Sequence, residues 1–110
     1  MTRSAILLLL LAAVLEAGGD AVIRAALHTS SAWPRAILFT LGAGVLFAYG
    51  YAVNAPAWDF GRLLGLYVVF FFWIAQGIST VAFKQPPSPA VLLGGVFISI
   101  GGIIIALANR

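Results

Sequence analysis

Four apolar stretches of membrane-spanning length, separated by short segments that break helices, occupy almost the whole chain. A helix needs about 20 mostly apolar residues to cross a bilayer. The breaking segments read HTSSAWP, NAPAWD and KQPPSPA, and their proline residues and capping residues favour helix ends and helix starts. We therefore predict one domain over residues 1–110, with helices over about residues 4–27, 33–53, 60–83 and 89–108.

The composition indicates that lipid covers most of this surface. Of the 110 residues, 63% are hydrophobic and 8% are charged, and one soluble core of this size cannot bury so much apolar surface. The predicted fold class is an all-α membrane protein of four transmembrane helices with short loops, so that neighbouring helices are antiparallel.

The first 19 residues also have the basic start and apolar centre of a secretion signal. Leu15 and Glu16 do not suit its cleavage site, and we interpret the segment as the first helix.

The chain lacks the residues that several functional classes require. The chain has no cysteine and a single histidine, so we expect no disulfide, no metal site and no cofactor. Its net charge of +3 is spread thinly, which does not support nucleic-acid binding. No nucleophile, base and orienting group come together, so we expect that the protein is not an enzyme.

The first apolar stretch carries an unusual charged stripe on one helix face, formed by Glu16, Asp20, Arg24 and His28. At about 1.5 Å per residue, Glu16 lies ~16 Å from the start of this helix, near the bilayer midplane. We expect Asp20 to pair with Arg24 inside the helix, and Arg24 and His28 to reach towards the headgroups.

Glu16 is the leading candidate for a functional group. A charged side chain at the centre of a membrane helix costs about 2.5 to 3.5 kcal/mol, so it normally faces a cavity or a partner. An ionised carboxylate can hold a cation and a protonated one cannot, so protons and cations compete for it. The alternative is structural, with Glu16 closing a polar network with Gln76.

The third apolar stretch supplies polar and aromatic side chains for a binding cavity. Trp73, Gln76 and Thr80 lie within two turns, and Tyr67 precedes them. Aromatic faces beside a carboxylate suit an organic cation.

Other aromatic residues are predicted to face lipid. We expect Phe70, Phe71 and Phe72 to lie on the lipid-facing surface, and Trp33 and Trp58 to anchor the interfaces.

The fourth apolar stretch carries a stripe of small residues, namely Gly95, Ser99, Gly102 and Ala106. Such a stripe allows close approach of another helix. It could face a neighbour in the same chain, but we favour a contact between two copies.

The basic residues show almost no bias between the two ends of the predicted bundle. One end holds Arg3, Arg62 and Arg110, and the other holds Arg35, Lys84 and Arg24. Because the side richer in Lys and Arg normally stays cytoplasmic, such a chain could insert both ways.

The sequence resembles the small multidrug resistance transporters, and within them the YnfA-like branch. The resemblance rests on LEAGG, AWPRA, PAWDFGRLLGLY and FKQPPSPAVLLGGVFISIGGIII. It implies an antiparallel homodimer, a membrane-embedded glutamate shared by proton and substrate, and export by alternating access. It selects Glu16 as that glutamate, Arg62 and Tyr67 as third-helix motif residues, and Gly95 and Gly102 as part of the dimer seam.

The chain departs from that branch at Leu64, Val68 and Val69, so the resemblance does not identify the substrate. The predicted function is export of small organic cations in exchange for protons, in the plasma (inner) membrane of a prokaryote. The alternative is a non-transporting membrane subunit or scaffold, or half of a heterodimeric translocator.

Overall fold

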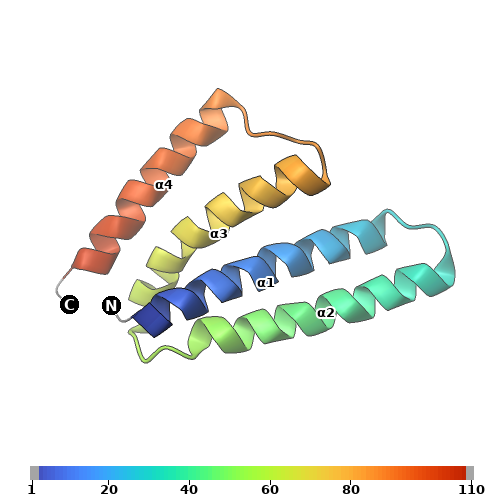
Figure 1. Ribbon diagram of the computed structural model, residues 1–110, viewed down its shortest axis with the longest axis horizontal. Helices are drawn as coiled ribbons and strands as arrows, with labels where there is room; N and C mark the ends of the chain where they lie inside the picture. Colours follow the sequence, from blue (N-terminus) through green and yellow to red (C-terminus); the bar gives the residue numbers. More distant parts are fainter. Residues whose placement is uncertain (1–2, 109–110) are drawn as a thin grey trace.

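The computed structural model describes residues 3–108 and consists of four helices joined by short loops (Figure 1). The helices are α1 (Arg3–Leu27), α2 (Ala32–Asn54), α3 (Phe60–Ala82) and α4 (Pro89–Leu107). Their ends lie within one residue of the expected positions. All four are long and apolar enough to cross a membrane. The protein is thus an all-α, multi-pass membrane protein. Arg110, which was counted among the basic residues at one end of the predicted bundle, lies outside the described residues.

The helices form two hairpins that meet through α1 and α3. Helix α1 packs closely on α2, and its other side contacts α3, while α4 lies on the far side of α3 (Figure 1). The α2–α3 loop lies at one end of the bundle, and the other two loops lie at the opposite end. Helices α1 and α3 therefore run in the same direction, and their C-terminal halves approach the same membrane surface.

The buried core lies where α1, α2 and α3 meet. Helix α1 contributes small side chains, among them Ala12 and Ala13, which let the neighbouring backbones come close. Leu66 and Tyr67 come from α3, and Val53 comes from α2. Tyr67 is the one residue of this core that carries a polar side-chain atom, and it is 4% exposed.

Local side-chain chemistry fixes the hairpin between α3 and α4. Ser88 caps α4 by accepting a 3.2 Å hydrogen bond from the backbone N–H of Val91, and Pro89 suits the first helical position. At the end of α3, Lys84 adopts a left-handed conformation with φ 55°. The chain then turns back so that the N–H of Gln85 donates to the carbonyl of Ser79 at 2.9 Å, and the Ser79 hydroxyl donates to the carbonyl of Gln85 at 2.8 Å.

The small-residue stripe of α4 lies against α3 in the same chain. Gly95 and Gly102 are buried, and added Cβ atoms would meet Phe72 and Val69 respectively. The Ser99 hydroxyl accepts a hydrogen bond from Trp73 of α3. The expected contact between two copies is therefore corrected to an intrachain one, because this is where α4 buries its smallest side chains.

Candidate functional site

The Glu16 side chain is hydrogen-bonded to Tyr67 at the place where three helices meet. The Tyr67 hydroxyl donates to Oε1 of Glu16 over 2.9 Å, joining α3 to α1. The Tyr67 ring stacks on Tyr49 of α2, with 5.8 Å between centroids, and lies 6.4 Å from the ring of Phe71. Glu16 is half-buried, so one side of its carboxylate stays accessible.

A second carboxylate lies one turn along α1, and it does not pair as expected. Asp20 is exposed and forms no ion pair with Arg24 within residues 3–108. The Arg24 guanidinium instead lies over the ring of Phe83, 5.3 Å from its centroid. The predicted Asp20–Arg24 pair is therefore wrong, because an aromatic side chain from the end of α3 holds the arginine. His28 lies just beyond the last residue of α1, so the charged stripe ends at Arg24 within that helix.

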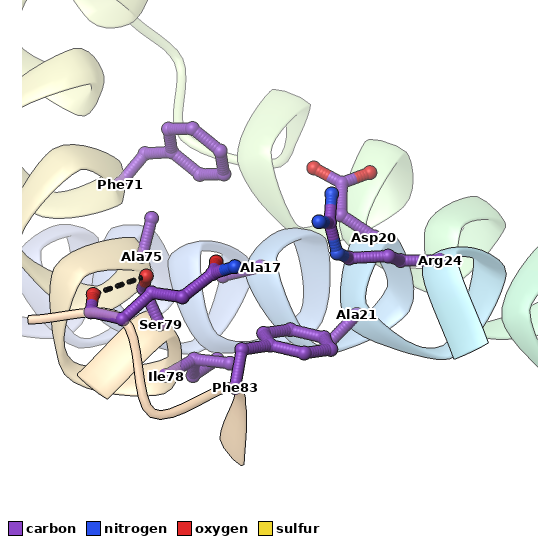
Figure 2. A pocket seen from close by; sticks show the side chains of 10 residues that line it. Ala17, Asp20, Ala21, Arg24, Phe71, Ala75, Ile78, Ser79 and Phe83 are labelled. Atoms are coloured by element: carbon purple, nitrogen blue, oxygen red, sulfur yellow. Dashed lines mark hydrogen bonds between the residues drawn. The ribbon is translucent and has the colours of Figure 1, made fainter. Parts of the chain in front are cut away.

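An open groove of about 280 Å³ separates α1 from α3 beside these groups (Figure 2). Asp20 and Arg24 stand on its α1 side, and both side chains project into the same space. Phe71 and Phe83 lie on the α3 side. The remaining lining residues are Ala17, Ala21, Ala75, Ile78, Ser79 and Gln85. The groove thus combines two charges of opposite sign with an apolar and aromatic wall.

Two predicted site residues of α3 are not brought to Glu16. Trp73 donates from Nε1 to the Ser99 hydroxyl over 2.8 Å, and Ser99 donates to the carbonyl of Gly95, so Trp73 is engaged with α4. The Gln76 side chain makes no hydrogen bond to Glu16 in the described chain, and its backbone carbonyl accepts from Thr80. Neither side chain is hydrogen-bonded to Glu16 within residues 3–108, and their part in substrate binding stays a prediction.

The phenylalanines expected to face lipid are instead partly buried between helices. Phe70 and Phe71 pack against the core, and Phe72 lies against Gly95 of α4. The position of Phe71 beside Tyr67 could have been predicted from the sequence, because Phe71 lies one turn after Tyr67 on the same helix face. Tyr49 carried no such signal, since nothing in the sequence shows which face of α2 meets α1.

Arg62 lies at the other end of the bundle and does not contact Glu16. It donates from its guanidinium to the carbonyl of Ala106 at 2.7 Å, and lies 4.6 Å from the centroid of the Trp58 ring. Trp58 is therefore partly covered, whereas Trp33 is 80% exposed. This arrangement gives Arg62 a role in holding α3, α4 and the α2–α3 loop together.

Comparison of the chain with models of protein families, with curated proteins and with solved structures gives no match.

Proposed function

We propose that this membrane protein exports small organic cations in exchange for protons, with Glu16 as the shared carboxylate. The observation that supports this most directly is the hydrogen bond from Tyr67 to a half-buried Glu16 at the junction of α1, α2 and α3. A carboxylate at this depth is expensive to insert and normally has a partner or a task. Here one oxygen has a partner, and the carboxylate stays accessible.

Protons and cations compete for Glu16 in this proposal. The ionised carboxylate binds a cation, aided by the neighbouring rings of Tyr67 and Tyr49. Protonation neutralises it and releases the cation. If the site opens to only one membrane surface at a time, this competition exchanges one for the other. The resemblance noted from the sequence supports the same mechanism, with two antiparallel copies in the plasma membrane of a prokaryote.

The test is proton release from detergent-purified protein on addition of a panel of quaternary ammonium and guanidinium compounds. We expect wild-type protein to release protons with at least one cation, and Glu16→Gln to release none. The substitution removes the charge but keeps the volume and an oxygen that can accept from Tyr67. Asp59→Asn is the matched control, because Asp59 is an exposed carboxylate at the start of α3. It should release protons like the wild type.

Absence of release from folded wild-type protein with every cation would overturn the exchange mechanism. The non-transporting subunit, or half of a heterodimeric translocator, would then become the better account. Loss of folding in Glu16→Gln would instead show that Glu16 acts structurally.

A further inference from the structure

Two oppositely charged side chains face the groove between α1 and α3, and within residues 3–108 they form no ion pair with each other. Asp20 and Arg24 are one helical turn apart, and both line the groove. A direct ion pair is sterically available to residues at this spacing, yet Arg24 lies over Phe83. Both charges are therefore available to a ligand.

The pairing of charges determines which ligands fit. A ligand with only a positive charge is attracted by Asp20 but repelled by Arg24. A ligand that carries both charges satisfies both side chains. The rest of the wall, including Ala17, Phe71 and Ile78, is apolar and complements an alkyl chain. The groove thus matches a zwitterionic amphiphile.

The order of the two charges along the membrane normal further restricts the class of ligand that fits the groove. Leu27 is the last residue of α1, so at about 1.5 Å per residue Asp20 lies ~10 Å and Arg24 ~5 Å from that end. The acid is therefore deeper than the base. In a phosphoglyceride of the adjacent leaflet, the phosphate lies nearer to the acyl chains than the ammonium does, which is the reverse of what Asp20 and Arg24 require.

We propose that this groove binds zwitterionic amphiphiles whose ammonium group is next to the alkyl chain and whose anionic group is at the outer end. The ammonium lies against Asp20, and the anionic group meets Arg24. The alkyl chain extends towards Ala17 and Phe71, the deepest lining residues of their helices. This binding does not require proton exchange and goes beyond the function proposed above.

The test compares three octyl amphiphiles by isothermal titration calorimetry of the protein in an uncharged maltoside detergent. The sulfobetaine has its ammonium next to the chain, the phosphocholine has the reverse order, and the trimethylammonium compound lacks the anion. We expect the sulfobetaine to bind about tenfold more tightly than either of the others. This comparison uses wild-type protein and depends on no variant.

Variants of Asp20 and Arg24 then test which charged group of the ligand each side chain binds. Arg24→Gln should abolish the preference for the sulfobetaine over the trimethylammonium compound, and Asp20→Asn should weaken binding of both. Arg35→Gln is the matched control, because Arg35 also lies over an aromatic ring, Phe39 at 5.5 Å, but outside the groove. It should leave all three affinities unchanged.

Equal binding of the sulfobetaine and the phosphocholine, a preference for the phosphocholine, or no binding would overturn the proposal. So would a preference that survives in Arg24→Gln. Glu16→Gln separates this proposal from proton exchange, since it should lose proton release but keep sulfobetaine binding.

Discussion

At the scale of single residues, the hydroxyl of Tyr67 is the one side-chain donor to Glu16 within residues 3–108. Tyr67→Phe removes it but keeps the ring stacked on Tyr49. We expect a loss of about 1 kcal/mol in the free energy of unfolding in mixed micelles, the usual size of a hydrogen bond between membrane helices. Tyr49→Phe is the control, because the Tyr49 hydroxyl has no hydrogen-bond partner in the described chain. Equal losses in the two variants would refute this role of the hydroxyl.

Arg62 offers a second test at the residue scale. Its planar guanidinium both donates to the carbonyl of Ala106 and covers the ring of Trp58. The compact ammonium of lysine cannot reproduce this combination. We expect Arg62→Lys to lower the free energy of unfolding by about 1 kcal/mol. The measurement is the thermal unfolding midpoint in detergent, which should fall accordingly. Arg35→Lys should change it little, since Arg35 is exposed and covers only Phe39. An unchanged midpoint in Arg62→Lys would contradict the bridging role.

The angular spacing on α3 explains why the sequence identified Tyr67 but misplaced its companions. At about 100° per residue, Trp73 lies ~240° around the helix from Tyr67, and Gln76 lies ~180° around it. These residues therefore turn away from the face that Tyr67 presents to α1. Phe71, ~40° away, stays on that face and contacts Tyr67. Glu16 could be identified because a midplane carboxylate is conspicuous in any apolar helix, whereas Tyr49 depended on the unknown rotation of α2.

At the scale of helices, α4 contains two glycine doublets, Gly94–Gly95 and Gly101–Gly102, and in each doublet one glycine contacts α3 and the other does not. Added Cβ atoms on Gly94 and Gly101 would meet nothing within 4 Å. On Gly95 the added atom would overlap the Phe72 ring, and on Gly102 it would overlap the Val69 side chain. Only the second glycine of each doublet therefore lets α4 approach α3 closely.

This asymmetry gives a prediction with a built-in control. Gly102→Ala should destabilise the protein by about 1–3 kcal/mol, because Val69 is branched and the Gly65 carbonyl oxygen lies 3.3 Å from the added Cβ, so the helices must separate. Gly101→Ala should be neutral or stabilising by up to about 1 kcal/mol, through helix propensity. The measurement is the free energy of unfolding in mixed micelles. Similar effects of the two substitutions would contradict the observed packing of α4.

Helix ends and helix partners were not equally predictable from the sequence. The three proline-containing segments marked the six helix ends that adjoin them to within one residue, because proline and capping residues act locally. The partner of Arg24 was not local. A pair with Asp20 is the natural expectation within one helix, but Phe83 approaches from the end of α3, and nothing in the first apolar stretch indicates that approach.

At the scale of the whole molecule, the arrangement of the hairpins leaves much of the apolar surface uncovered. Helix α4 packs mainly on α3, and α2 packs mainly on α1, so the two outer helices do not close the bundle. Large side chains such as Phe47, Phe97 and Ile104 are exposed along them. Lipid covers these faces in a single copy, and the proposed antiparallel pair would bury part of them. Because the α4 stripe is already occupied by α3, such a pair must use other faces.

An antiparallel pair also requires copies inserted in both orientations, which the even charge distribution permits. The chain has no cysteine, so Ala57→Cys provides a single reporter in the exposed α2–α3 loop. We expect a membrane-impermeant maleimide to label about half of these molecules from each side of the membrane. Lysines introduced by Ser30→Lys and Ser31→Lys should hold the α1–α2 loop in the cytoplasm, so that Ala57→Cys is labelled only from outside. The Ser31 side chain makes no capping hydrogen bond, so its replacement removes no cap from α2. Labelling of the otherwise unaltered chain from one side alone would exclude an antiparallel pair of identical copies and would point instead to a partner of opposite orientation.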